Sequence, residues 1–276
     1  MIALSTGSLY TYGAARVFDL AARAGYDGVE VLVDHRRDTR QPGYLRRLAA
    51  DSGQPIVALH SPFVLDVPGW PDDQLGRLKQ TVALAQELDV PLVVTHLPLR
   101  TYALESYWHG RRSRRFFLPM PLRRRGYYAD FLRDQLEVFE NDVGVTIAVE
   151  NMPARRFLGR AIDGYWFNTP TDLERFPHLT LDTTHLATWG LDPLAVYRQL
   201  EHHVAHVHLS NYDGREHRSP VDGHLRLEGL LHHLAECAYR GAITVECHPD
   251  ALEAGDEARC MAALQQAAAF CRAHAC

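Results

Sequence analysis

Acidic residues and histidines stand at the ends of six consecutive apolar segments of this 276-residue chain. They are His60, His96, Glu150, Asp182, His208 and Glu246. One histidine at a strand end would mean little, because such a residue is more often a hydrogen-bonded part of the core. Six polar ends in succession are hard to explain by packing alone, since burying unpaired carboxylates together is costly and a bound cation removes that cost. The pattern therefore predicts a metal site.

Two glutamates, one aspartate and one histidine form the predicted ligand set. The set comprises Glu150, Asp182, His208 and Glu246. An oxygen-rich set with a single imidazole favours Mn²⁺, Mg²⁺, Co²⁺ or Zn²⁺ over copper or iron–sulfur chemistry. We therefore expect a divalent metal ion as the cofactor.

Eight short runs rich in Val, Ile, Leu and Ala are predicted to be strands that are buried on both faces. They cover residues 2–6, 28–33, 55–60, 91–96, 144–150, 178–182, 204–209 and 242–247. Amphipathic helical patterns lie between them or after the last one, at residues 14–25, 71–89, 127–141 and 257–273. This alternation predicts an α/β protein with a (β/α)8 TIM barrel, in which the carboxyl ends of the strands meet at one mouth. An open doubly wound sheet is the alternative, and the lack of GxGxxG after the first strand weakens its dinucleotide-binding form.

Composition limits the classes of function. The net charge of −5 and the pI near 6.3 do not favour nucleic acid or membrane as a partner. No segment approaches 18 continuous apolar residues, which argues against a membrane span. None of the five cysteines forms a CxxC pair, so a disulfide framework or a cysteine-rich zinc site is not expected. We expect one cytoplasmic domain over residues 1–276, and the sequence leaves its oligomeric state open.

One region departs from the alternation of strands and helices. Residues 98–126 are predicted to be an irregular insertion after the fourth strand, and residues 111–125 within it contain seven arginines and no acid. A loop of this length is uncommon in a compact domain unless it is functional or disordered. Three interpretations stay open: a solvated loop, a lid whose arginines bind a substrate phosphate, and a nucleic-acid patch.

Five motifs resemble one known family. They are LHSPF (59–63), AVENMP (148–153), LDTTHLATWG (181–190), VHLSN (207–211) and TVECHP (244–249). Together they look like the xylose-isomerase-like TIM-barrel superfamily, which includes sugar-phosphate isomerases and epimerases, ketose 3-epimerases, inosose dehydratases and the DNA-repair enzyme endonuclease IV. The resemblance covers nearly the whole chain apart from the arginine-rich insertion.

The epimerase branch implies a metal-dependent isomerase or epimerase of a sugar, sugar phosphate or cyclitol, acting through an enediolate-type intermediate. The four residues of the predicted ligand set match the single metal site of that branch. Glu150 and Glu246 match the glutamates that also move the substrate proton, and His185 matches the histidine that contacts the sugar. The implied partner is a small sugar-like molecule.

The endonuclease IV branch implies the competing function, a zinc phosphodiesterase or AP endonuclease with three metal ions. His60, His96 and His185 match three of its additional ligands, and the first two are candidates for a second ion. A DxH pair supplies the rest, and two registers compete for it. One assigns Asp222 and His224 as ligands of a third ion.

The other register, which we prefer, assigns Arg215 and His217. An arginine at that position would repel a third cation and could bind a substrate oxygen instead. A barrel that has lost its activity and serves as a binding protein is a third hypothesis. The intact carboxylate set argues against it.

Overall fold

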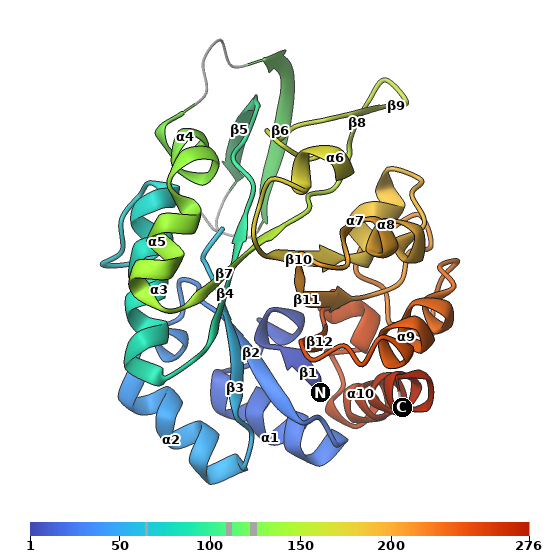
Figure 1. Ribbon diagram of the computed structural model, residues 1–276. Coiled ribbons are helices and arrows are strands. Elements are labelled where there is room, and N and C mark those ends of the chain that lie inside the picture. The colour runs from blue at the N-terminus through green and yellow to red at the C-terminus, as the bar shows by residue number, and fades with distance from the viewer. Residues whose placement is uncertain (64–65, 109–111, 122–125, 276) are drawn as a thin grey trace.

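The computed structural model describes residues 1–63, 66–108, 112–121 and 126–275. Eight parallel strands close into a barrel (Figure 1). In spatial order they are β1 (Ile2–Ser5), β12 (Ala242–Val245), β11 (Val204–Leu209), β10 (Leu179–Asp182), β7 (Thr146–Glu150), β4 (Leu92–His96), β3 (Ile56–His60) and β2 (Gly28–Leu32). The predicted TIM barrel is confirmed, and the open-sheet alternative is wrong.

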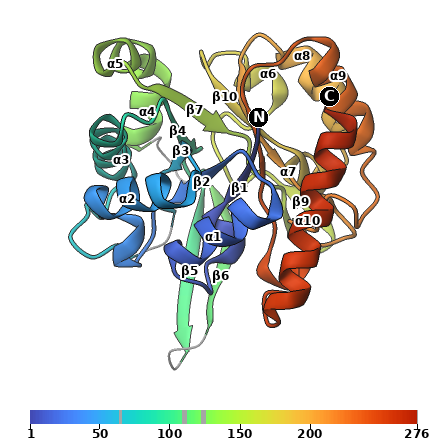
Figure 2. The same cartoon turned by 90° about the horizontal axis from the view of Figure 1, so that it is seen from below.

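Helices surround the barrel, as the view along it shows (Figure 2). The longer ones are α1 (Ala14–Ala24), α2 (Pro42–Ser52), α3 (Gln74–Leu88), α4 (Tyr127–Asp134), α5 (Leu136–Val143), α8 (Pro193–Leu200), α9 (Leu227–Glu236) and α10 (Glu257–His274). Shorter elements are α6 (Pro170–Leu173), α7 (Thr183–Thr188), η1 (Thr6–Leu9), η2 (Arg37–Thr39) and η3 (Pro249–Leu252). The helix predicted over 127–141 is broken at Gln135, whose φ of −129° is not helical.

The inner face of the barrel carries its polar residues above small apolar ones. Ala58, Val94 and Ala148 belong to an apolar cluster that is separate from the main core. Each lies two residues before a polar strand end, namely His60, His96 and Glu150. Residues two apart on a strand share a face, so these three strands present an apolar layer below a polar layer at the mouth.

The insertion after β4 contains regular structure where an irregular loop was expected. Strands β5 (Thr101–Trp108) and β6 (Arg112–Pro121) pair antiparallel, so that prediction is wrong. Residues 109–111 and 122–125 and the side chains of 102–125 lie outside the described part of the chain. The lid and nucleic-acid interpretations of the arginine-rich segment fall on those side chains.

A second hairpin follows β7 and is joined to the first at its base. It consists of β8 (Arg155–Phe157) and β9 (Arg160–Ile162), and both hairpins lie at the mouth end of the barrel (Figure 1). Leu99 and Tyr165 form an antiparallel bridge, and the amide of Arg100 donates to the carbonyl of Gly164 at 2.7 Å. Among the described residues, no helix is long and apolar enough to cross a membrane.

Candidate metal centre

Strand register brings the polar strand ends together. His96 on β4 lies directly beside Glu150 on β7, and Asp182 on β10 lies directly beside His208 on β11. Glu246 follows the last residue of β12. Because all these strands are parallel, the side chains converge on the same end of the barrel.

The four predicted ligands form one cluster. Ligand atoms of Glu150, Asp182, His208 and Glu246 all lie within 4.8 Å of one another. Nδ1 of His208 is 3.2 Å from Oε1 of Glu150 and 3.1 Å from Oε2 of Glu246. The structure therefore assembles the predicted set on the side of His208 that carries Nδ1.

One oxygen of the cluster has the environment expected of a cation ligand. Oδ1 of Asp182 accepts a hydrogen bond from the amide of His185 at 2.8 Å and so caps α7. Oδ2 is buried and has no hydrogen-bond partner among the described residues. Burial, reinforced by the carboxylates of Glu150 and Glu246, raises the pKa of Asp182 to about 8. A bound divalent cation would satisfy Oδ2, and three carboxylates with one imidazole fit such an ion.

The remaining charges of the cluster are balanced through His208. Burial alone would raise the pKa of Glu246, but the nearby His208 lowers it to about 2. The pKa of Glu150 is also held well below its ordinary value, because His208 and His96 outweigh the effect of burial. Burial lowers the pKa of His208, and the surrounding glutamates more than reverse this effect. Both glutamates are thus carboxylates at neutral pH.

Two further histidines contact the second oxygen of Glu150. Oε2 lies 3.2 Å from Nε2 of His60 and 3.0 Å from Nε2 of His96. Nδ1 of His60 donates to the carbonyl of Ser61 at 2.8 Å, so Nε2 is the nitrogen that faces Glu150 and would bind a second ion. These contacts bring His60 and His96 to the position predicted for a second ion.

His185 and His217 approach the cluster from the other side. Their rings meet edge to face with centroids 5.2 Å apart, and both offer ligand atoms within 4.8 Å of Asp182. Nδ1 of His185 donates to the carbonyl of Asn151 at 2.8 Å. Burial lowers the pKa of His185 to about 3, so this ring is neutral. A neutral imidazole can accept a hydrogen bond from a substrate hydroxyl or bind a metal ion.

The other candidates lie outside the cluster. The side chain of Arg215 is 71% exposed and pairs with Asp213, Nη2 to Oδ2, at 2.7 Å. Asp222 and His224 are exposed. Of the two registers, the one containing His217 therefore brings a histidine to the site, and the nine-ligand arrangement is not assembled. Substrate contact by His185, Arg215 and His217 stays a prediction.

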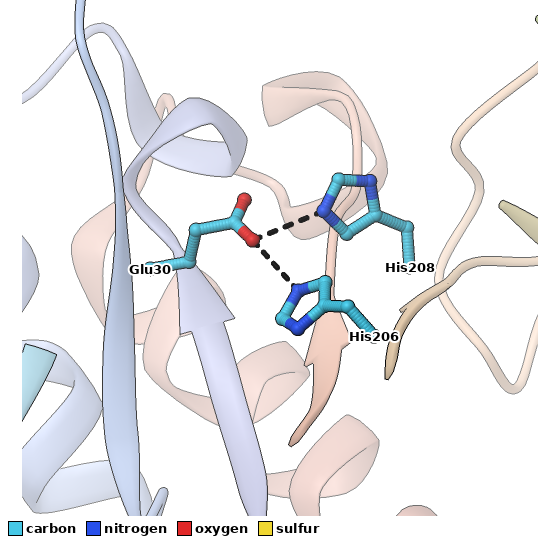
Figure 3. A group of neighbouring side chains, drawn as sticks. All are labelled: Glu30, His206 and His208. Atoms are coloured by element: carbon cyan, nitrogen blue, oxygen red, sulfur yellow. Dashed lines mark hydrogen bonds and ion pairs between the residues drawn. The ribbon is translucent and has the colours of Figure 1, made fainter. Parts of the chain in front are cut away.

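Glu30 and Phe63 were missed as site residues in the sequence. Glu30 lies in the middle of β2 and contacts His206 and His208 (Figure 3). The sequence does carry one signal for Glu30, because it is a single carboxylate between two buried valines of an apolar strand. The ring of Phe63 stacks on His96 with centroids 4.9 Å apart and has no signal beyond its motif.

A cavity of about 180 Å³ opens above the cluster. Its walls are formed by the polar residues already described and by side chains from the loops around the mouth. They are His60, Phe63, His96, Glu150, Met152, Pro153, Arg155, Tyr165, His185, Glu216, His217 and Glu246. A wall that combines polar and apolar surface with an aromatic ring suits a small hydroxylated molecule.

Comparison with known proteins gives the family. Residues 18–264 match the family described as Xylose isomerase-like TIM barrel. The chain belongs to this family. An uncharacterized protein of Mycobacterium tuberculosis (strain H37Rv) is 27% identical over 99% of this chain and 97% of its own length. The predicted superfamily is thereby confirmed.

Solved structures of other proteins share this barrel fold at low sequence identity. The apo form of a 3-keto-D-glucoside 4-epimerase from E. coli superposes with a TM-score of 0.67 at 17% identity, covering 99% of this chain and 98% of its own. A family 2 AP endonuclease from Brucella melitensis superposes with a TM-score of 0.61 at 17% identity, covering 90% and 93%. At such identities the likeness shows the xylose isomerase-like fold and not the reaction.

Proposed function

We propose that the protein is a divalent-metal-dependent isomerase or epimerase of a sugar, sugar phosphate or cyclitol. One observation carries the proposal. Glu150 and Glu246 both contact Nδ1 of His208 within a cluster that fits a cation. Two carboxylates beside one metal ion are what proton transfer next to a carbonyl needs.

The residues of the site have different roles in the proposed reaction. A bound cation would supply the positive charge that stabilises a developing enediolate. One glutamate removes the proton from the hydroxyl-bearing carbon next to the carbonyl group. The other is also ionised, so it first takes a proton from a substrate hydroxyl or from solvent and then delivers it to the opposite face or to the neighbouring carbon. Neutral His185 accepts a hydrogen bond from a sugar hydroxyl, and Phe63 forms the apolar side of the pocket.

The pocket and the comparisons favour this chemistry. Glu246 is the more accessible of the two glutamates, with 14% of its side chain exposed against 1% for Glu150. It is therefore placed to reach the substrate first. The E. coli structure is that of a sugar epimerase, which is consistent with the same class of substrate.

Solvent exchange tests the proposal without knowledge of the exact sugar. Metal-loaded protein is incubated in D₂O with a panel of ketoses, sugar phosphates and cyclitol ketones, and deuterium at the carbon next to the carbonyl is followed by NMR. We expect exchange with at least one substrate and its loss in Glu150→Gln, which preserves side-chain shape. Full exchange by Glu150→Gln would refute the assignment.

A zinc phosphodiesterase or AP endonuclease is the second candidate. It is favoured by the contacts of His60 and His96 with Glu150, which would suit a second ion. The structural similarity to the family 2 AP endonuclease from Brucella melitensis also favours it. Exposed Asp222 and His224 argue against it. Metal analysis decides between the two: one or two ions per chain support the isomerase, whereas three ions and incision of abasic-site DNA support the endonuclease.

A further inference from the structure

A polar cluster lies within the barrel, next to the candidate metal centre and outside its ligand set. It consists of Glu30 from β2 and of His206 and His208 from β11 (Figure 3). At most 1% of any of the three side chains is exposed. Oε2 of Glu30 lies 2.8 Å from Nε2 of His206 and 3.0 Å from Nε2 of His208. One carboxylate oxygen thus accepts from two imidazoles.

We propose that Glu30 is a positioning residue of the metal centre, and this rests on the proposed metal-dependent function. Its carboxylate holds the proton of His208 on Nε2. Nδ1 of His208 is then left to bind the cation, and it points at the right place. It lies 3.2 Å from Glu150, 3.1 Å from Glu246 and 4.0 Å from Asp182. The two nitrogens of one ring therefore face two different carboxylate environments.

The second hydrogen bond explains the presence of His206. Residues 206 and 208 lie two apart on β11, so both rings project from the same face of the strand. His206 donates to the oxygen that His208 uses and thereby fixes Glu30 against rotation. A carboxylate that orients a ligating imidazole also increases its basicity, which strengthens the metal bond.

A purely structural role does not explain why the Glu30 carboxylate is buried. Burying a carboxylate inside a barrel costs free energy unless its charge is compensated. Neutral side chains would join β2 and β11 at lower cost. A charged acceptor at this position is explained if the imidazole beyond it must donate electron density to a cation.

The experiment compares two glutamates that are each paired with a histidine. Glu30→Gln removes the charge but keeps the side-chain shape. The matched control is Glu140→Gln, because Glu140 is also buried and its Oε1 lies 2.5 Å from Nδ1 of His178, but the pair lies at the opposite end of the barrel. Co²⁺ affinity is measured by the visible absorption of the bound ion and by calorimetry, with circular dichroism as the check on folding.

We expect Glu30→Gln to weaken Co²⁺ binding about 10–100-fold and Glu140→Gln to leave it unchanged. Long-range ¹H–¹⁵N correlation spectra of the metal-loaded protein should assign the Nε2–H form to His208 in the wild type. A merely structural role of Glu30 would not determine which nitrogen of His208 carries the proton. His206→Gln, which retains a donor toward Glu30, should bind Co²⁺ more tightly than Glu30→Gln.

Three results would overturn the inference. They are equal Co²⁺ affinity of folded Glu30→Gln and the wild type, an Nδ1–H form of His208 in the loaded protein, and a second ion held by Glu30 and His206. Failure of the wild type to bind any divalent ion is a different outcome. It would refute the proposed metal-dependent function itself.

Discussion

Carboxylates at the two ends of the barrel have opposite environments. At the amino-terminal end, Oδ2 of Asp27 accepts from the amide of Ile2 at 2.7 Å and Oδ1 pairs with Arg272 at 2.6 Å. At the mouth, three carboxylates crowd around His208, and one oxygen of Asp182 has no hydrogen-bond partner in the described part of the chain. Both oxygens of Asp27 thus have partners within the protein, whereas one oxygen of Asp182 has none among the described residues.

The pKa shifts of the two aspartates show the same contrast. Burial would raise the pKa of Asp27, but the hydrogen bond from Arg272 lowers it below 3.8. Burial raises the pKa of Asp182 to about 8. Because a lowered carboxyl pKa stabilises the folded state at neutral pH and a raised one opposes it, stability and function draw on different ends of the molecule.

The largest expected effect comes from comparing a Glu→Gln substitution at the mouth of the barrel with one at its amino-terminal end. Glu246→Gln at the mouth should lower turnover by about 10²–10⁴-fold, because the general acid–base group is lost. Glu140→Gln at the amino-terminal end should leave turnover unchanged. Steady-state kinetics with a substrate found by solvent exchange measures both, and equal losses would abolish the functional contrast between the ends.

The next effect is stabilisation by metal. A divalent ion at 100 times its Kd should stabilise the folded chain by about 2.7 kcal/mol, because it binds only the assembled mouth. Thermal unfolding with Mn²⁺, Zn²⁺ or excess EDTA measures the shift in Tm. Asp27→Asn should retain the full shift, and Asp182→Asn should lose most of it. A metal response that survives Asp182→Asn would place the ion elsewhere.

Asp182→Asn should also stabilise the metal-free protein. The amide keeps an oxygen to cap α7 and removes a carboxyl group whose ionisation is opposed by burial and whose second oxygen has no partner among the described residues. Relief of that cost is worth about 1–3 kcal/mol. Chemical denaturation in EDTA is the measurement, and a clear loss of stability would show that the mouth is not strained by its own carboxylates.

The smallest effect belongs to Asp27 and appears as a pH dependence. Its lowered pKa contributes stability above 3.8 that is lost as the pH falls through the lower folded value. The carboxylate is 35% exposed, so solvent screening limits the contribution to less than about 1 kcal/mol. Asp27→Asn should flatten the acid limb of the unfolding free energy, whereas a limb that stays as steep would assign it to other carboxyl groups.

The strands were readable because they follow local periodicity, and the proximity of the four predicted ligands, whose role stays a prediction, followed from the strand ends. The predicted strand at 204–209 is β11 to the residue, and polar strand ends must converge once the strands are parallel. The contacts of Glu30 could not be predicted, because its partners lie three strands away around the barrel and only closure brings β2 opposite β11. The pairing of β5 with β6 was hidden because prolines in β6 lower strand propensity.

Pairing of β1 with β12 has a consequence for synthesis of the chain. Ile2 is in register with Ile243, so the sheet cannot close until the last strand has been synthesised and pairs with the first. Such a contact spans almost the entire sequence and is slow to form. Glu246 follows β12 directly, and its arrival coincides with closure. A nascent chain still lacking its final segment therefore has neither a sealed barrel nor the full set of proposed ligands, so the proposed ion could bind only when synthesis is nearly complete.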